Sequence, residues 1–285
     1  MKNNRRHWLK ALVVAPLWAC LPALADEAED ELAKIRQRGR LRIAVYNDFP
    51  PYATAGGKGI DADLGRAVAE RLGLAPEIVG FNADEDMNDD LRNMVWKGHY
   101  LGTQPADVML HVPVDEHLAR ANDKVRIFGT YHRESLALAR NPERIPALAG
   151  SAAVALEIFT REKIGTETAT LADSFLLGVL NGRLRENVVH FRNPGEAVKA
   201  LADGRIAAVL APRGELEAAL KGDTRFAIDV PKFAELKIDS WPLGMAVKAE
   251  AVTLAEAIGR ALAELKQDGT VAAIFKRHGI SYLPG

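Results

Sequence analysis

Two aromatic residues flank a pair of prolines early in the chain, in the order Phe-Pro-Pro-Tyr from Phe49 to Tyr52. Proline has no backbone N–H and restricts the residue before it, so this segment is expected to be a fixed, extended bend. The bend follows a predicted strand, and ligands of open α/β sheets bind at the carboxyl ends of strands. We therefore expect Phe49 and Tyr52, together with Tyr46 and Tyr131, to line a site for a small molecule.

A group of histidines lies in the same half of the sequence. Four of the seven histidines fall between residues 99 and 132, and His111 and His117 are close to Asp115 and Glu116. Imidazoles and carboxylates are ligands of zinc and copper, but the spacing here matches no known metal motif. We expect His111 and Asp115 to contact the ligand directly, with no metal and no other cofactor.

The composition limits the class of protein. The chain has 285 residues, 48% of them hydrophobic, and a formal net charge of -1. This hydrophobic content is typical of a folded globular protein. No basic patch interleaved with aromatic residues occurs, so nucleic-acid binding is not expected. The single cysteine, Cys20, excludes a disulfide within one chain.

Residues 1–25 have the features of a cleaved signal peptide. A basic segment is followed by an apolar run that is too short to span a membrane, and then by the small-residue cleavage site Ala23-Leu24-Ala25. Arg5 and Arg6 resemble the twin-arginine export signal, and an ordinary basic segment is the alternative. Lipidation of Cys20 is a further alternative. We expect export to the periplasm.

The rest of the chain alternates between predicted strands and helices. Strands are expected over 41–46, 77–81 and 107–112, with helices over 61–72 and 89–96 between them, and Asp61 and Asp63 are expected to cap the first helix. A second run of the same kind begins with strands over 135–140 and 152–156. Such β-α-β runs predict an α/β fold with parallel strands and helices on both faces of the sheet.

Both ends of this pattern resemble the family 3 periplasmic solute-binding proteins. The resemblance is carried by the aromatic-proline bend with Gly59-Ile-Asp-Ala-Asp-Leu64 after it, and by the closing stretch Ala261-Leu-Ala-Glu-Leu-Lys-Gln-Asp-Gly-Thr270. It implies a two-lobed, type II periplasmic binding protein fold whose hinge has two crossovers. The implied domains are lobe 1 at 26–132, lobe 2 at 133–242, and a return to lobe 1 at 243–285.

The residues with which this family holds an amino acid are missing at their expected positions. No Arg follows the strand 107–112 at the usual turn, and only Arg120 could replace it in a shifted register. Pro212 stands where the ammonium-binding Asp is expected, and the threonine-rich turn of lobe 2 is replaced by the segment 157–160. We therefore expect a non-zwitterionic ligand, with Glu157 and Pro212 on the lobe 2 side of the cleft.

Part of the sequence also resembles one subgroup of solute-binding-like proteins. The stretch from Asp107 to Pro113, followed by Tyr131-His132-Arg133-Glu134-Ser135, is similar to solute-binding-like proteins associated with periplasmic quinoprotein methanol dehydrogenase, although His111 stands where that subgroup has glycine. This adds Arg133 to the expected site.

Three functions follow as expectations. The first is a binding protein that delivers a small-molecule ligand to an ABC transporter permease. The second is an accessory protein that docks onto a periplasmic quinoprotein alcohol dehydrogenase. The third is a dehydratase-like enzyme with Glu157 as general acid. Because no catalytic motif occurs in the sequence, the first is preferred and the chain is not expected to be an enzyme.

Overall fold

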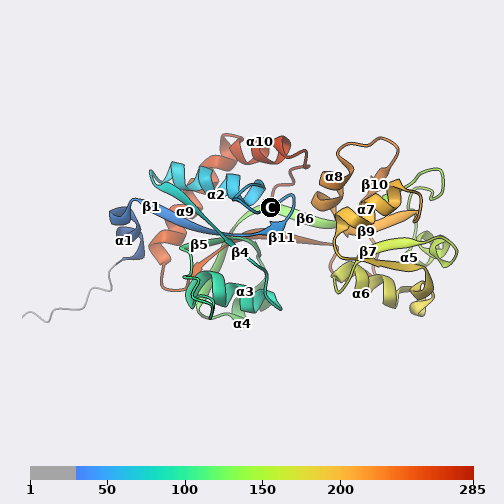
Figure 1. The fold of residues 1–285 in the computed structure, drawn as a ribbon, viewed down its shortest axis with the longest axis horizontal. Helices are drawn as coiled ribbons and strands as arrows, with labels where there is room; N and C mark the ends of the chain where they lie inside the picture. Colours follow the sequence, from blue (N-terminus) through green and yellow to red (C-terminus); the bar gives the residue numbers. More distant parts are fainter. Residues whose placement is uncertain (1–29) are drawn as a thin grey trace, which may run out of the picture.

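One long strand, β6 (Val125–Arg140), runs through both halves of the molecule and gives it two lobes (Figure 1). The computed structural model describes residues 30–285, so the predicted signal peptide, the Arg5-Arg6 pair and Cys20 lie outside the described residues. The hydrogen-bonded strand order is β4-β1-β5-β11-β6-β9-β7-β8, with β10 also paired with β6. The fold is α/β and two-lobed, as the sequence predicts.

Lobe 1 is built on a mixed sheet with helices on both faces (Figure 1). Its central strand pairs in parallel with one strand on each side, and β11 joins the sheet in the antiparallel direction. The strands are β1 (Arg40–Tyr46), β4 (Ala75–Phe81), β5 (Val108–Pro113), β11 (Ser240–Lys248) and the first part of β6. The helices are α1 (Glu31–Arg38), α2 (Ile60–Arg71), α9 (Val252–Gln267) and α10 (Thr270–Arg277), and on the opposite face α3 (Met87–Leu91), the π-helical turn Arg92–Trp96 and α4 (Glu116–Ala121).

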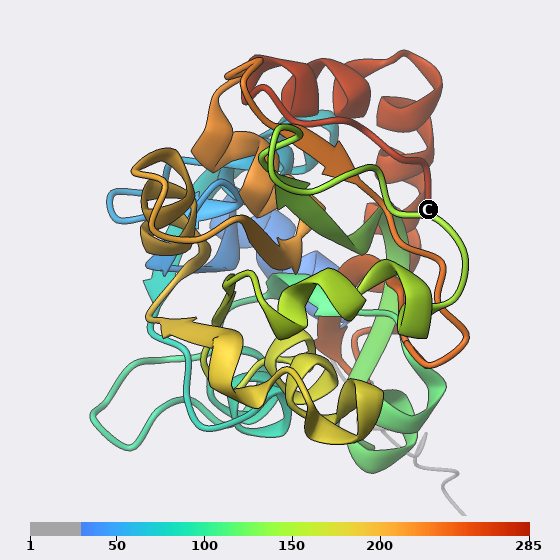
Figure 2. The same cartoon turned by 90° about the vertical axis from the view of Figure 1, so that its right-hand side faces the viewer.

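Lobe 2 has a smaller sheet, covered by helices in the same way. The strands are β7 (Ile164–Glu167), β8 (Val188–Phe191), β9 (Ala208–Pro212), β10 (Ala227–Asp229) and the end of β6. The helices are α5 (Ala152–Ala155), α6 (Leu171–Gly178), α7 (Pro194–Ala202) and α8 (Arg213–Leu220), with short 3₁₀ turns at Glu157–Thr160, Val179–Gly182 and Arg185–Asn187. Figure 2 views the molecule from the end of this lobe.

The lobes meet where β6 changes its pairing partner. Its residues up to Ser135 pair with β11, and those from Leu136 onward pair with β9 and β10. The predicted boundaries at 132/133 and 242/243 fall within these paired strands, and we keep them as a proposal for the extent of each lobe.

Separate hydrophobic cores stabilise the two lobes. One cluster contains buried residues from Leu32 to Tyr131 and from Leu243 to Ile280, so the C-terminal helices pack with the N-terminal half of the chain. Two further clusters lie within residues 136–236. The amphipathic pattern of α9, with Leu254, Ile258 and Leu265 all buried, produces this return.

The sequence misplaced the first elements of lobe 2. The predicted strand over 152–156 is wrong, because these residues form helix α5 and part of the turn that follows it. The strand at this place in the fold is β7, which the sequence analysis missed, and β6 begins ten residues earlier than the predicted strand at 135. The alanine-rich segment 152–156 is compatible with a helix as well as with a buried strand. A short apolar run of this kind does not distinguish between the two.

The C-terminal segment lies against the hinge. The backbone N–H of Arg133 donates to the Leu283 carbonyl, and the Leu283 N–H donates to Nδ1 of His132. The Ser281 N–H donates to Glu217 of α8 at 2.6 Å. In Figure 1 the C-terminus lies beside β6 and β11, on the lobe 1 side of the hinge. The end of the chain therefore connects α10 of lobe 1 to α8 of lobe 2.

No helix within residues 30–285 has the length and apolarity needed to cross a bilayer.

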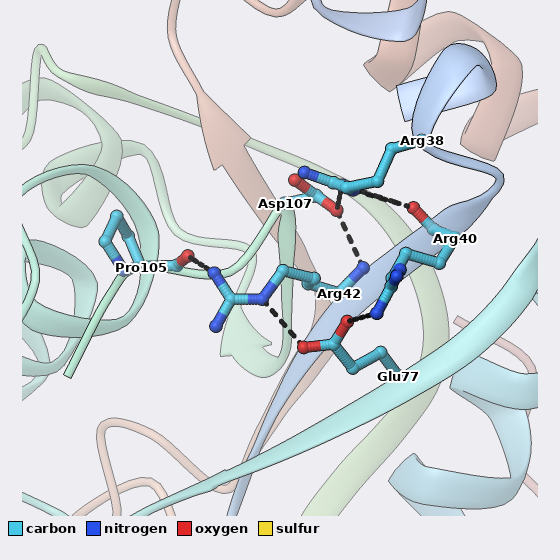
Figure 3. Close-up of polar contacts among 6 residues, drawn as sticks. All are labelled: Arg38, Arg40, Arg42, Glu77, Pro105 and Asp107. Carbon is cyan, nitrogen blue, oxygen red and sulfur yellow. Dashed lines mark hydrogen bonds and ion pairs between the residues drawn. The ribbon is translucent and has the colours of Figure 1, made fainter. Parts of the chain in front are cut away.

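An ion cluster fixes the amino ends of the lobe 1 strands (Figure 3). The Asp107 carboxylate accepts hydrogen bonds from the Arg42 N–H at 2.7 Å and from the Arg38 guanidinium. Arg42 also donates to Glu77 and to the Pro105 carbonyl. Burial raises the pKa of Asp107, while these donors oppose the shift. The cluster thus attaches α1 and β4 to the central strands, far along the sheet from the cleft.

The Asp107→Ala variant tests this cluster. It removes the carboxylate that accepts from the Arg42 backbone N–H and the Arg38 guanidinium, so these donors lose their partner and the free energy of unfolding should fall by about 1–3 kcal/mol in urea titrations. Glu116→Ala is the control, because Glu116 pairs with Arg120 on the exposed face of α4 and should have no measurable effect. Equal unfolding midpoints for the two variants would contradict a structural role for Asp107.

Candidate functional site

A pocket lined mainly by apolar side chains opens at the carboxyl ends of the lobe 1 strands. Its volume is about 440 Å³, and we call it the aromatic pocket. Tyr46 ends β1, His111 lies in β5, and Phe49 belongs to the short hairpin of β2 (Asp48–Phe49) and β3 (Ala53–Thr54). The remaining lining residues are Asp48, Asn82, Ala83 and Met87. The aromatic-proline bend therefore lies at the carboxyl ends of the lobe 1 strands, the edge at which ligands of open α/β sheets generally bind.

Phe49 is at the centre of the aromatic side chains. Its ring is edge-on to His111 with centroids 4.7 Å apart, and it also contacts Tyr46 and Tyr52 at 5.8 and 5.6 Å. The Tyr52 ring lies 4.3 Å from His111. Edge-to-face contacts of this kind are favourable, so the rings form a preorganised wall. The Tyr46 hydroxyl donates to buried Asp90 at 2.7 Å and so is already engaged.

A buried carboxylate orients His111. Asp61 is fully buried, with Oδ1 accepting from the Tyr131 hydroxyl at 2.7 Å and Oδ2 lying 3.1 Å from His111 Nδ1. Tyr131 in turn accepts from the His111 backbone N–H at 3.2 Å. A hydrogen bond between Nδ1 and Asp61 Oδ2 fixes the orientation of the imidazole ring. The lining of the aromatic pocket therefore includes an imidazole held in place by a buried carboxylate, beside the polar side chains of Asp48 and Asn82.

This position also explains a departure seen in the sequence. The φ of His111 is +62°, in the left-handed region that glycine adopts most easily. Glycine was expected at this position from the sequence resemblance, whereas this chain has a histidine whose ring contacts Asp61. The hydrogen bond and the ring contacts with Phe49 and Tyr52 oppose the strain of the left-handed backbone.

A chain of contacts joins lobe 1 to lobe 2 behind this pocket. The Tyr52 hydroxyl donates to Oε2 of Glu134 in β6, and the same carboxylate accepts from the N–H groups of Ser135 and of Gly214 at the start of α8. Burial raises the pKa of Glu134, and the hydrogen bonds oppose this shift. A Cβ at position 214 would lie 2.3 Å from the Tyr52 oxygen, so only glycine allows this close approach.

A second pocket lies between the lobes, and we call it the interlobe pocket. Its volume is about 500 Å³. Lobe 1 contributes Asp48, Phe49 and Pro50, and lobe 2 contributes Glu167 at the end of β7, Arg192 after β8, the start of α7, and Glu215, Ala218 and Ala219 of α8. Phe49 and Asp48 line both pockets, so the two are adjacent.

Five of the predicted site residues come together and three do not. Tyr46, Phe49 and His111 line the aromatic pocket, while Tyr52 and Tyr131 are buried directly behind it. The three that lie apart are Asp115, which caps α4 by accepting from the Leu118 N–H, Arg133, which is exposed on β6, and Glu157, which pairs with Arg183 in lobe 2. None of these three lines either pocket.

Glu157 lies apart because the lobe 2 turn was assigned to the wrong segment. The strand-to-helix turn of this lobe runs from β7 to α6 through residues 168–170, and Thr170 caps α6. The residues over 157–160 instead form a 3₁₀ turn after α5. The missed strand β7 thus explains why Glu167, at its carboxyl end, was not predicted.

Other site residues were also missed or misread. Asp61 and Asp63 were expected to cap α2, but the helix begins after Gly59 without a side-chain cap, and Asp63 contacts Arg66 and His278 instead. Asp61, Glu134 and Glu215 are buried carboxylates, but Glu134 and Glu215 have polar or charged neighbours in the sequence, so no local signal marked these two as buried. Their partners are distant in sequence, so the pairing itself was not visible.

No cluster of three or more His, Cys, Asp or Glu side chains in the part of the chain that the structure describes is placed to hold a metal. Two members of the histidine group between residues 99 and 132 lie apart in the structure. His111 lines the aromatic pocket, and His117 lies on α4.

Replacing His111 with glycine and, separately, with alanine tests the strain at this position. Both variants lose the contact with Asp61, but only alanine keeps a Cβ at a left-handed φ. We expect His111→Ala to be less stable than His111→Gly by about 1 kcal/mol in urea unfolding. Equal stability would show that φ at this position relaxes without strain.

The Glu215→Gln variant tests a buried charge. Burial raises the pKa of Glu215 well above 4.5, and the nearby charges of Glu167 and Glu134 raise it further. The folded state then holds this proton more tightly than the unfolded state, so the charge lowers stability as the pH rises. Glu215→Gln should raise Tm at pH 8, by roughly 2–4 °C for each kcal/mol gained, with little gain near pH 4.5. Glu157→Gln, outside the pocket, should show no such pH-dependent gain, and a loss of stability in Glu215→Gln at pH 8 would contradict the argument.

Comparisons with known proteins identify the fold. No family model and no curated protein sequence matches the chain. Among solved structures, an ancestral cationic amino acid solute-binding protein matches with a TM-score of 0.67 at 19% identity, over 87% of this chain and 99% of that chain. An amino acid ABC transporter substrate-binding protein from Streptococcus pneumoniae, bound to L-arginine, matches with a TM-score of 0.61 at 18% identity, over 88% and 99%. The L-cysteine solute receptor of Neisseria gonorrhoeae matches with a TM-score of 0.58 at 20% identity, over 87% and 92%. The chain therefore has the fold of the two-lobed periplasmic binding proteins.

Proposed function

We propose that this chain is a periplasmic solute-binding protein that closes its two lobes over a small molecule and delivers it to an ABC transporter permease. The observation that carries the proposal is the interlobe pocket, which is lined by residues of both lobes. Its volume of about 500 Å³ lies in the range typical of small-molecule sites. The names of the solved structures with this fold, which include solute-binding proteins and a solute receptor, support the same role.

Binding between lobes couples affinity to closure. A ligand that contacts Phe49 from lobe 1 and Glu215 from lobe 2 makes its full set of contacts only when the two walls are close. Such a ligand shifts the population toward the closed state by its difference in affinity for the two states. The hinge strands β6 and β11 are the segments that would absorb the motion.

The proposed ligand class is wider than the sequence indicated. The sequence predicted a non-zwitterionic ligand because the carboxylate-binding Arg of lobe 1 and the ammonium-binding Asp of lobe 2 are missing. Arg120 does not replace the missing Arg, because it pairs with Glu116 on an exposed helix. The interlobe pocket, however, contains Arg192 as well as carboxylates, so both charges of an amino acid could be paired there at other positions. Several similar structures are named as amino acid binders. We therefore include amino acids among the candidate ligands.

A ligand screen by thermal shift tests the proposed function. At a hundredfold excess over Kd a ligand should raise the free energy of unfolding by about 2.7 kcal/mol. The Phe49→Ala variant removes one of the two side chains that line both pockets, and it should weaken binding of the hit at least tenfold in calorimetry. The control Tyr100→Ala alters an aromatic residue that is 88% exposed and lines neither pocket, and it should bind like the wild type. A screen of the common periplasmic nutrients without any hit would contradict the proposal.

Two alternatives from the sequence are separated by the same screen. An accessory protein of a quinoprotein dehydrogenase should show no ligand and should instead co-purify with the dehydrogenase. A dehydratase-like enzyme should convert its ligand, and one similar structure is described as the precursor of cyclohexadienyl dehydratase. The general acid suggested for that enzyme, Glu157, lines neither pocket and forms an ion pair with Arg183, so it does not favour this alternative.

A further inference from the structure

The interlobe pocket carries an excess of negative charge. Three carboxylates line it, those of Asp48, Glu167 and Glu215, against one guanidinium, that of Arg192. The carboxylate of Glu134 lies close enough behind them to act on Glu215 electrostatically. Within residues 30–285 no ion pair or hydrogen bond joins the side chain of Glu167, Glu215 or Arg192 to another residue.

Glu215 is the most constrained of these groups. Only 7% of the residue is exposed, yet its carboxylate has no hydrogen-bond donor among the described residues. Glu215 lies in the first turn of α8, where the helix dipole stabilises a negative charge. This stabilisation is small compared with the cost of removing the carboxylate from water. Buried carboxylates in proteins are normally paired, since an unpaired one is costly or takes up a proton. The described part of the chain therefore supplies no counterion for Glu215.

We propose that the interlobe pocket selects a ligand with an ammonium or guanidinium group, held by the carboxylates of Glu215 and Glu167. This inference rests on the proposed solute-binding function and names its ligand class. A cation placed there would pair both carboxylates and relieve their mutual repulsion, so its binding energy would grow as the lobes close and exclude water. The ring of Phe49 on the facing wall offers an aromatic surface to the same cation.

The chemistry of the pocket favours an organic cation over a metal ion. No three ligating side chains of the described residues are grouped for a metal, and the volume of about 500 Å³ far exceeds that of a single ion. Arg192 on the same wall, next to the start of α7, would repel a metal ion but would pair with an anionic group of a larger ligand. A basic amino acid would pair its side-chain cation with the carboxylates and its own carboxylate with Arg192, whereas an amine without a carboxylate would pair with the carboxylates alone.

A panel of three matched probes tests the proposal by calorimetry and thermal shift. L-arginine carries the side-chain cation and a carboxylate, agmatine carries the cation without the carboxylate, and L-citrulline has a neutral urea group in place of the guanidinium. We expect L-arginine or agmatine to bind at least tenfold more tightly than L-citrulline. Glu215→Gln should reduce the affinity for the bound cation at least tenfold, and Glu167→Gln should reduce it less.

Two controls make the result specific. Glu157→Gln removes a carboxylate of the same lobe outside the pocket and should change the affinity less than twofold. Circular dichroism of Glu215→Gln should match the wild type, because the variant is expected to be at least as stable. Equal affinity for L-arginine and L-citrulline, or unchanged cation binding in Glu215→Gln, would overturn the assignment.

The outcomes also separate this inference from the proposed function. If no probe cation binds but a neutral or anionic solute from the wider screen does, the cation inference is wrong and the solute-binding function stands. If neither the probes nor the screen gives a ligand, both are wrong.

Discussion

The hydrogen-bonded pairing of β6 determines where every part of the cleft lies. Each backbone N–H and C=O of a buried strand needs a partner, so a strand that leaves one sheet must enter another at once. β6 does this between Ser135, paired with β11, and Leu136, paired with β9. Glu134 lies next to this change of partner, and through its carboxylate it contacts Tyr52 from one lobe and Gly214 from the other. The lobes are therefore joined by side chains as well as by backbone.

This junction separates two environments that share Phe49. On the lobe 1 side the carboxylate of Asp61 is fully satisfied by Tyr131 and His111, so it acts as a rigid support for the aromatic wall. On the lobe 2 side the carboxylate of Glu215 is buried with no partner from the described chain. Buried carboxylates thus have two roles here. Asp61 has a structural role, and Glu215 has the role that we propose for it, which is to bind a ligand. The difference lies in whether a donor from the chain reaches the group.

The C-terminal segment adds a second connection between the lobes. Leu283 is bonded to β6 at the hinge, and Ser281 is bonded to Glu217 of α8, the same helix that carries Glu215. Any motion of α8 relative to lobe 1 must therefore also strain or release these contacts. The end of the chain thus influences the same wall of the pocket as the Tyr52–Glu134–Gly214 contacts.

The sequence by itself determined the class of fold and the aromatic wall. The periodicity of helix α2 and the strand before the proline bend were visible locally, because they depend on the pattern of neighbouring residues. The placement of Phe49 at the carboxyl end of β1 followed from the general rule for α/β sheets. These features need no knowledge of distant contacts.

Only the tertiary structure decided the charges of the site. Asp61 and His111 are fifty residues apart and Tyr52 and Glu134 are eighty-two apart, so no local pattern could pair them. The alanine-rich segment 152–156 was ambiguous between helix and strand, and misreading it moved the lobe 2 turn to Glu157 and hid Glu167. Burial of Glu215 without a partner is a property of the assembled lobes. A sequence shows that a carboxylate is present, but only the packing of the elements around it determines whether water, a donor from the chain or a ligand will neutralise it.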